Sequence, residues 1–259
     1  MVDLHCHILP GLDDGPATMD DSLEMARVAA ANGIATIVAT PHVRDDHPYP
    51  LERIDSLVAE LNELLAGQGI ALRVRSGGEV AVAKLHELSD DVLGRLRLGD
   101  GRHLLVESPY THATDLLEQE IFSAHIRGFP AMLAHPERSP SFLSDPDRLA
   151  ALVERGVLCS ITAGSMAGRF GRTVQRFTAL LFERGLVHDV ASDAHGPVGR
   201  APALQFGFEA LDEQLPGLLR QAGWYTRAAP EAVLAGTELP SRPEPVSRPG
   251  ALRRLFARR

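Results

Sequence analysis

Val2-Asp3-Leu4-His5-Cys6-His7-Ile8 opens the chain, and Leu9-Pro10-Gly11-Leu12-Asp13-Asp14-Gly15 continues it. Side chains of a β-strand alternate between its two faces, so we expect His5 and His7 on one face. Leu4, Cys6 and Ile8 are then expected on the other face. Two adjacent imidazoles at a strand end, with carboxylates in the next loop, are suited to a transition-metal site. Two surface histidines near a terminus are the alternative, and His-x-His alone does not decide between the two.

Composition narrows the class of protein. The chain has 259 residues and a net charge of −8, which argues against a general nucleic-acid or membrane-surface binder. Its two cysteines, Cys6 and Cys159, both lie in apolar runs, as expected of buried thiols in a reducing compartment. The sequence has neither a secretory h-region nor an apolar run long enough to cross a bilayer. We therefore expect a cytoplasmic protein without stable membrane insertion.

The C-terminal end differs in composition from the rest. Prolines are frequent from residue 240 to 249, and the last residues are strongly basic. We expect a barrel domain over residues 1–238, with residues 239–259 as an extended linker and a short amphipathic or disordered arm. A solvated tail, or contact with an acidic partner or anionic lipid, would both fit this composition.

Short apolar strands alternate with helical patterns along the chain. Strands are expected over residues 2–7, 34–40, 72–80, 103–107, 130–135, 157–162 and 187–193, with helices between them. Such alternation indicates parallel strands joined by crossover helices. Seven units suit a TIM-type barrel that lacks one strand. An open doubly wound sheet is the alternative, but no glycine-rich phosphate motif follows the first strand.

Potential metal ligands recur at the predicted carboxyl ends of these strands, where such barrels carry their active sites. An isolated buried charge is unfavourable. The large number of polar groups at the carboxyl end of the barrel therefore indicates a shared site. The set exceeds the needs of one ion and predicts two or three, with a bridging carboxylate; Zn²⁺, Mn²⁺ and Fe²⁺ accept such mixed ligands. Phosphoester hydrolysis is the natural chemistry of such clusters. The candidates are His5, His7, His42, Glu79, Glu107, His135, Asp193 and His195.

Arginines lie shortly after two of these candidates. Arg138 follows His135 and Arg200 follows His195, where guanidinium groups could bind phosphate oxygens in a bidentate manner. Loop arginines paired with surface acids are the alternative. Among the remaining histidines, His47 and His112 follow strands and could lie at the rim of the site. The others are expected at the surface or at strand starts.

Together these residues resemble the PHP (polymerase and histidinol phosphatase) superfamily, and within it the manganese-dependent protein-tyrosine phosphatases of bacterial capsule biosynthesis. The resemblance extends from residue 2 to about 205, and its N-terminal block is specific to the phosphatase branch. It is carried by Asp3-Leu4-His5-Cys6-His7-Ile8-Leu9-Pro10-Gly11-Leu12-Asp13-Asp14-Gly15-Pro16, Ala39-Thr40-Pro41-His42, Ser76-Gly77-Gly78-Glu79-Val80, Leu105-Val106-Glu107, Ala134-His135-Pro136-Glu137-Arg138 and Ala191-Ser192-Asp193-Ala194-His195.

The resemblance implies a distorted TIM-like (β/α)₇ barrel with three divalent metal ions, Mn²⁺ first and Zn²⁺, Fe²⁺ or Co²⁺ as alternatives. One ion would take His5, His7, Glu79 and Asp193. A second would share Glu79 and take Glu107 and His135. The third would take His42 and His195, with Asp14 rather than Asp13 as its carboxylate. Arg138 and Arg200 fall where the family binds the substrate phosphate, and the segment after strand six is less rich in amides than the family pattern.

The implied function is a metal-dependent protein-tyrosine phosphatase acting on the phosphotyrosine tail of a bacterial tyrosine kinase that controls capsule or exopolysaccharide synthesis. A metal-bridging hydroxide would attack phosphorus. Cys-x₅-Arg is absent at both cysteines, and His86 is not followed by the second histidine of a zincin. Three alternatives stay open: a phosphatase for a small phosphomonoester such as histidinol phosphate, an amidohydrolase, and a non-catalytic kinase-binding regulator.

Overall fold

The computed structural model describes residues 1–47, 50–109 and 115–248. The strands are β1 (Val2–Cys6), β2 (Thr36–Ala39), β3 (His42–Val43), β4 (Arg73–Ser76), β5 (Glu79–Ala81), β6 (Leu104–Glu107), β7 (Ala131–Ala134), β8 (Leu158–Thr162) and β9 (Asp189–Ala191). The longer helices are α1 (Met19–Ala31), α2 (Leu51–Gly67), α4 (Asp115–Ile126), α6 (Pro146–Glu154), α8 (Arg172–Glu183) and α9 (Gln205–Asp212). Shorter helical segments are η1 (Val82–Lys84), α3 (Asp90–Arg95), η2 (Pro136–Arg138), α5 (Pro140–Ser144), α7 (Ala163–Met166), α10 (Leu218–Gly223), η3 (Trp224–Ala228) and α11 (Ala229–Ala235).

The strands form a ring of parallel pairs. One sheet has the order β1-β2-β4 and the other β3-β5-β6-β7-β8-β9. The chain runs from β2 into β3 and from β4 into β5, so these pairs are two halves of single strands. The ring closes between β1 and the residues after β9: Asp193 N donates to His5 O and His7 N donates to Ala194 O, both at 2.9 Å. The result is the expected seven-stranded barrel.

Two of the expected strands are broken in the middle. The strand expected over residues 34–40 is shorter, and β3 resumes at His42 beyond Pro41, which has no N–H to donate. The strand expected over residues 72–80 is interrupted at Gly77 and Gly78, so Glu79 begins β5 instead of ending a strand. A Cβ on Gly77 would lie only 2.7 Å from Val38 Cγ1, so the close approach of the chain to β2 favours glycine here.

A register shift in β1 corrects the expected alternation. Asp3 pairs with Ile37 and Cys6 with Ala39, so β1 holds one more residue than β2 between these pairs. As a result Leu4 packs inside the barrel base with Val38, Leu105, Met132 and Leu158, and not with Cys6 and Ile8. Cys6 and Ile8 face the layer of helices as expected. The shift leaves His5 and His7 on the same side.

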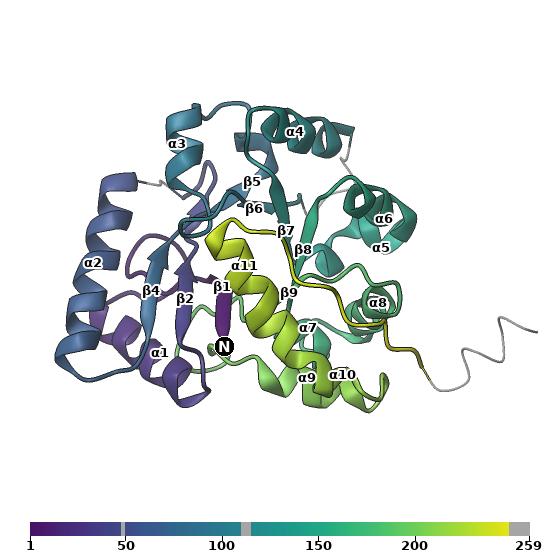
Figure 1. The fold of residues 1–259 in the computed structure, drawn as a ribbon. Helices are drawn as coiled ribbons and strands as arrows, with labels where there is room; N and C mark the ends of the chain where they lie inside the picture. The colour runs from purple at the N-terminus through teal and green to yellow at the C-terminus, as the bar shows by residue number, and fades with distance from the viewer. Residues whose placement is uncertain (48–49, 110–114, 249–259) are drawn as a thin grey trace, which may run out of the picture.

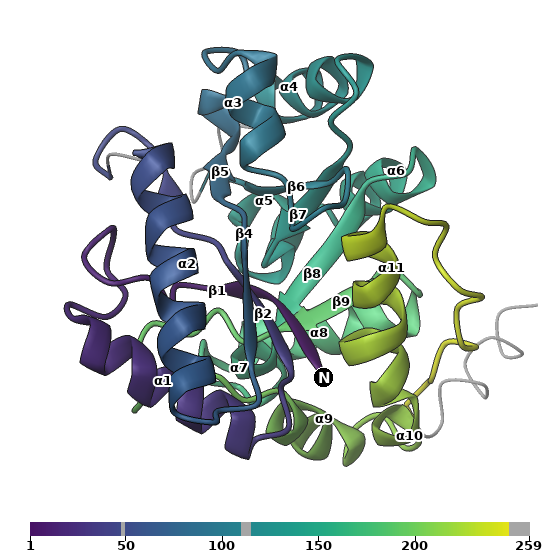
Figure 2. The ribbon, with the colours of Figure 1, turned by 60° about the vertical axis from the view of Figure 1, so that its left-hand side comes forward.

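Helices surround the strands on the outside, as Figures 1 and 2 show from two directions. Helix α1 begins with a capping box: Thr18 Oγ1 accepts from Asp21 N while the Asp21 carboxylate accepts from Thr18 N. Helix α11 lies across the N-terminal end of the barrel, where Val233 and Leu234 pack with Val2. Between β5 and β6 the helical structure is limited to η1 and α3, with turns between them.

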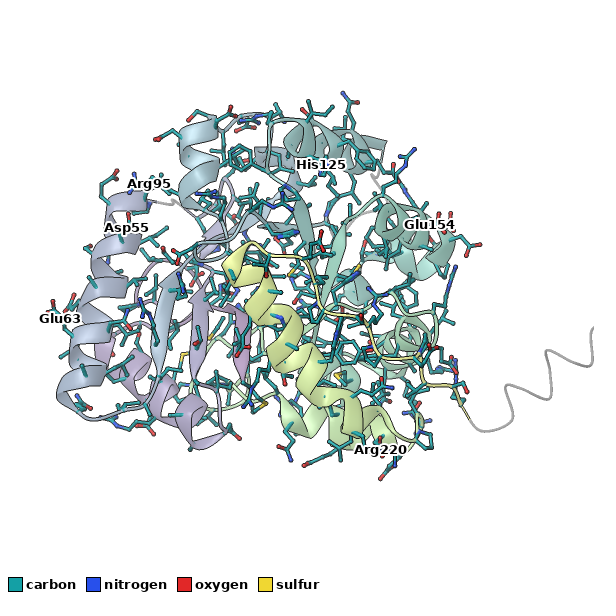
Figure 3. All side chains as sticks on the ribbon, viewed as in Figure 1. Asp55, Glu63, Arg95, His125, Glu154 and Arg220 are labelled. Carbon is teal, nitrogen blue, oxygen red and sulfur yellow. The ribbon has the colours of Figure 1, made fainter. Side chains whose placement is uncertain are left out.

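Charged side chains line the outward faces of these helices, as the labelled residues of Figure 3 illustrate. Arg95 on α3 forms ion pairs with Glu52 and Asp55 on α2, at 2.9 and 2.8 Å. These contacts lie at the exposed surface. They join neighbouring helices and are separate from the strand ends.

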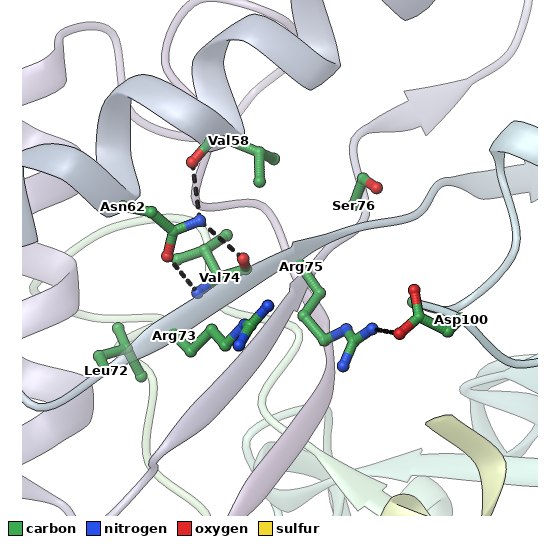
Figure 4. A pocket seen from close by; sticks show the side chains of 9 residues that line it. Val58, Asn62, Leu72, Arg73, Val74, Arg75, Ser76 and Asp100 are labelled. Carbon is green, nitrogen blue, oxygen red and sulfur yellow. Dashed lines mark hydrogen bonds and ion pairs between the residues drawn. The ribbon is translucent and has the colours of Figure 1, made fainter. Parts of the chain in front are cut away.

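One edge of β4 is covered by a side chain in place of a strand. Asn62 on α2 donates to Val74 O at 2.8 Å and accepts from Val74 N at 2.9 Å (Figure 4). The amide therefore satisfies both backbone groups that a neighbouring strand would use. This gap in strand pairing beside β4 is the distortion of the barrel.

Residues 239–248 run back along the barrel. Leu239 packs against the barrel base, Val246 packs against the outer core, and the Arg248 guanidinium binds the Glu183 carboxylate on α8. The expected linker is thus attached up to residue 248, and the division at residue 238 stays a prediction. The basic end at 249–259 lies outside the described residues.

Both cysteines are free and buried, as expected. Over the described ranges, none of the helices has the length and apolar character needed to cross a membrane.

Candidate metal centre and phosphate site

The nine predicted ligands gather at the carboxyl end of the barrel. His42 and Glu79 begin the short strands β3 and β5, and the others come from a strand end or the loop that follows one, so residues far apart in the sequence meet there. Their side-chain atoms form four overlapping groups, each with all ligand atoms within 4.8 Å of one another. The groups are His7, Asp14, His42 and His195; His5, His7 and Asp193; His5, Glu79 and His135; and His42, Glu79 and Glu107.

Around His5 and His7 the carboxylate oxygens lie at distances expected of ligands to one ion. His5 Nε2 and His7 Nε2 are 3.2 Å apart, and each lies 3.3 Å from Glu79 Oε2. Asp193 Oδ1 lies 3.5 Å and 3.6 Å from the same two nitrogens. Tetrahedral ligands about 2.1 Å from an ion are about 3.4 Å apart. The buried donor set therefore fits a divalent cation.

Two further groups flank the first one. His135 Nε2 is 2.9 Å from Glu79 Oε1 and 3.8 Å from Glu107 Oε1. This leaves the two Glu79 oxygens facing different histidines, as a bridging carboxylate requires. On the other flank, Asp14 Oδ1 is 3.2 Å from His195 Nε2 and 3.5 Å from His42 Nε2.

Asp13 and Asp14 have different environments. The Asp13 carboxylate is buried and lies 2.7 Å from His7 Nδ1, the ring nitrogen that faces away from the other ligands. It also accepts from Gly15 N at 2.9 Å and from His42 N at 3.0 Å. Asp13 thus orients His7, whereas Asp14 lies among the ligands. A Cβ on Gly15 would lie 2.4 Å from His7 O, which explains the glycine of this loop.

The cluster perturbs the pKa values of its own members. Burial disfavours the charged form of Glu79 and Asp193, but the His5 charge and the other neighbouring histidines and arginine together outweigh it and lower the pKa of both carboxyls. Burial also acts against a charged His7, yet hydrogen bonds to Asp13 and Glu79 raise its pKa to about 10. Burial, and then the Glu79 charge, raise the pKa of Glu107. Densely packed ionisable groups of both signs are typical of functional sites.

Backbone conformation distinguishes two of these ligands. His135 and Asp193 have φ angles of 33° and 50°, and they are the non-glycine residues with positive φ in the described parts of the chain. Such conformations are unfavourable outside glycine and persist only where the surroundings hold them. Both residues point their side chains into the cluster.

Arg138 and Arg200 meet at the same carboxylate. Arg138 Nη1 donates to Asp193 Oδ2 at 2.7 Å, and Arg200 Nη2 lies 2.6 Å from that oxygen. The Phe170 ring lies beneath Arg138, with 4.4 Å between Cζ and the ring centroid. A cavity of about 140 Å³ opens beside these groups, lined by Asp14, His42, Arg44, Glu107, His135, Arg138, Asp193, His195 and Arg200.

Sequence reasoning missed Arg44 and Glu137. Arg44 lines the cavity two residues after His42, so strand alternation from His42 could have identified it. Glu137 is fully buried and accepts from Thr162 N at 3.0 Å and from Thr162 Oγ1. The end of the sixth predicted strand, which is less rich in amides than the family pattern, is thus bonded to Glu137 through Thr162. No feature of the sequence pointed to this contact.

The remaining histidines lie apart from the ligands. The His47 ring is 5.4 Å from that of His42, at the rim, while His112 lies outside the described residues. His103, half-buried, precedes β6, and His188, buried, precedes β9; burial lowers their pKa values to about 4 and about 3. His86 is exposed, and His125 lies at the surface of α4 (Figure 3).

A larger cavity of about 500 Å³ lies beside β4 (Figure 4). Its polar lining comes mainly from Asn62, Arg73, Arg75, Ser76 and Asp100. Arg75 binds Asp100 there, and none of the groups of potential metal ligands reaches this cavity. The smaller cavity, in contrast, is lined by six of the predicted metal ligands.

Known proteins share both the sequence and the fold. The tyrosine-protein phosphatase YwqE of Bacillus subtilis (strain 168) is 40% identical over 199 residues, which is 75% of this chain and 77% of YwqE. The tyrosine-protein phosphatase CpsB of Streptococcus pneumoniae is 25% identical over 219 residues, covering 82% and 89%. A solved chain from work on YwqE and CpsB, described as "unique metal-dependent tyrosine phosphatases", superimposes with a TM-score of 0.82 at 34% identity, covering 96% of this chain and all of that one.

A more distant likeness concerns the fold alone. The β-aspartyl dipeptidase of Fervidobacterium islandicum AW-1 superimposes with a TM-score of 0.58 at 15% identity, covering 90% of this chain and 72% of that one.

The family profile "Capsular polysaccharide synthesis, CpsB/CapC" matches residues 1–217, which is most of the barrel. Profile, relatives and metal-ligand groups agree with the resemblance that the sequence motifs carried. The chain belongs to the CpsB/CapC family of metal-dependent tyrosine-protein phosphatases of capsule synthesis.

Proposed function

We propose that this chain hydrolyses phosphotyrosine on the tail of a bacterial tyrosine kinase that controls capsule or exopolysaccharide synthesis. The observation that carries the proposal is the meeting of His5, His7, Glu79 and Asp193 at coordination distances directly beside two arginines. Metal ligands and guanidinium groups facing one small cavity suit a phosphoryl group. The family's named phosphatase activity supports the same conclusion.

The donor set is suited to three divalent ions, and we propose Mn²⁺. The first ion would be held by His5, His7, Glu79 and Asp193. The second would share Glu79 and add Glu107 and His135. The third would be held by His42, His195 and Asp14. The division follows the family resemblance, and it is compatible with the spacing, since neighbouring ligand atoms of the second and third sets lie 2.9–3.8 Å apart.

When bound, the ions would supply an activated water and neutralise charge on the phosphoryl group. The protein's own part is to bind and orient that group. Arg138 and Arg200 already point at one oxygen of Asp193, so a phosphoryl oxygen arriving beside it would find two guanidinium groups in place. Phe170 beneath Arg138 and the 2.8 Å bond from Arg169 to Gly199 O support these positions. Such preorganised donors stabilise charge in the transition state without rearrangement.

Hydrolysis of two substrates tests the proposal. The purified protein, supplied with Mn²⁺, should release phosphate from a phosphotyrosine peptide of a kinase tail and much more slowly from histidinol phosphate. His135→Ala and Asp193→Ala should abolish turnover, while Arg95→Ala at the surface of α3 should not. Preference for histidinol phosphate would replace the proposal with the small-molecule alternative. Metal-loaded protein that binds the kinase but hydrolyses neither substrate would indicate a regulator.

A further inference from the structure

The cavity beside the metal ligands has a third guanidinium group whose role the family resemblance does not assign. Arg44 lines this cavity together with Arg138 and Arg200. It follows His42 by two residues at the end of β3, so both side chains leave the strand on the side of the site. Its side chain is 32% exposed, which keeps it reachable from the solvent.

A tight turn fixes the orientation of Arg44. His47 N donates to Arg44 O at 3.1 Å, which closes the turn. The Asp46 carboxylate lies within it, with Oδ1 2.8 Å from Arg44 Nε. This ion-pair contact lies on the Nε side of the guanidinium group, makes no hydrogen bond to Nε, and leaves the two terminal nitrogens for other partners. Asp46 therefore positions Arg44 and does not occupy its phosphate-binding edge.

The terminal nitrogens of Arg44 lie near Glu107 but beyond hydrogen-bonding distance. Nη1 is 3.8 Å from Glu107 Oε2, which is too long for a hydrogen bond. In contrast, Arg138 and Arg200 make short contacts with Asp193. Glu107 ends β6 and Asp193 follows β9, and β7 and β8 lie between those strands in the sheet. Arg44 and the other two arginines thus approach the cavity from different sides.

We propose that Arg44 is a third phosphate-binding residue, which contacts a non-bridging phosphoryl oxygen from the side of Glu107. This inference rests on the proposed phosphatase function. A dianionic phosphoryl group has three non-bridging oxygens, so two arginines on one side leave an oxygen for a donor on the other side. Arg44 supplies a charge-assisted, two-nitrogen donor at that place.

Phosphate binding and turnover test the role of Arg44 in the full-length, Mn²⁺-loaded protein. Loss of one charge-assisted contact should raise the inhibition constant of orthophosphate, and the KM for the phosphotyrosine peptide, by about 10–100-fold in Arg44→Ala. Arg44→Lys should recover part of the loss. Metal content should equal that of the wild type. Arg95→Ala, which removes an exposed arginine of similar ion pairing, is the matched control.

Two outcomes would overturn this role. An unchanged orthophosphate constant in Arg44→Ala would show that Arg44 does not touch the phosphoryl group. A reduced metal content with unchanged phosphate binding per bound ion would assign Arg44 to holding Glu107. If the wild type fails to hydrolyse the phosphotyrosine peptide, the proposed function fails instead. Orthophosphate binding measured by calorimetry still decides the role of Arg44 in that case.

Discussion

Adjacent carboxylates in one loop should respond differently to the same substitution. Asp14→Asn removes a predicted ligand that faces His195 and His42, and its side chain is 54% exposed. Asp13→Asn leaves every predicted ligand in place but removes the carboxylate that orients His7. We therefore expect Asp14→Asn to lower the number of bound ions by one. We expect Asp13→Asn to weaken metal-ion binding without changing the number of ions bound at saturation.

The size of the Asp13 effect follows from its three hydrogen bonds. Oδ2 faces His7 Nδ1 and His42 N, while Oδ1 accepts from Gly15 N. An amide can keep its oxygen toward the first two donors, and its NH₂ group then faces Gly15 N–H. One buried donor without an acceptor costs about 1–3 kcal/mol. Loss of a carboxylate behind a ligating histidine typically lowers metal affinity about 10–100-fold.

Two measurements check this prediction. In metal-free protein, Asp13→Asn should lower the midpoint of thermal unfolding by roughly 2–12 °C, since about 1 kcal/mol corresponds to 2–4 °C for a chain of this size. Asp14→Asn should leave the midpoint nearly unchanged, because its carboxylate is half exposed. In Mn²⁺ titrations followed by elemental analysis, Asp13→Asn should reach the wild-type ion content at higher metal concentration. If Asp13→Asn instead loses an ion and Asp14→Asn titrates like the wild type, the two roles are reversed.

Three further predictions concern residues outside the ligand set. Burial raises the pKa of the Cys6 thiol well above its usual range, so Cys6→Ala should keep the wild-type kcat, and loss of turnover with intact metal content would make the thiol a participant. Burial lowers the pKa of His188 from 6.5 to about 3, so stability falls as pH falls through this window. Between about pH 7.5 and pH 5.5, the free energy of unfolding of the wild type should fall by about 1.4 kcal/mol more than that of His188→Gln in denaturant titrations. Equal decreases would refute the lowered pKa of His188. Asn62→Ala should cost about 1–2 kcal/mol in the same assay because the Val74 backbone groups lose their partner, whereas unchanged stability would mean that water replaces the amide fully.

Periodicity predicted most of the ligand set because parallel strands end at a common edge. His42, Glu107, His135 and Asp193 could all be placed near His5 from strand–helix alternation alone, although they are distant in the sequence. The registers could not be predicted in this way. The extra residue in β1 moves Leu4 to the barrel base, and hydrophobicity is the same on either side of the strand. Arg44 lies just beyond the two-residue strand β3, and alternation counted from His42 places it on the side of the site.

Local sequence also gives no sign of the left-handed conformations at His135 and Asp193, because both residues are held by contacts made at a distance. Asp193 N donates to His5 O, which closes the barrel, and its side chain receives Arg138 and Arg200. His135 O accepts from Arg138 N at 2.9 Å, so the strained residue and the arginine share one turn. Closure of the ring, placement of two predicted ligands and orientation of Arg138 therefore depend on the same few bonds. A fold whose closing contacts are also its site contacts cannot relax this strain without opening the metal centre, and this explains why the strain persists at these two positions.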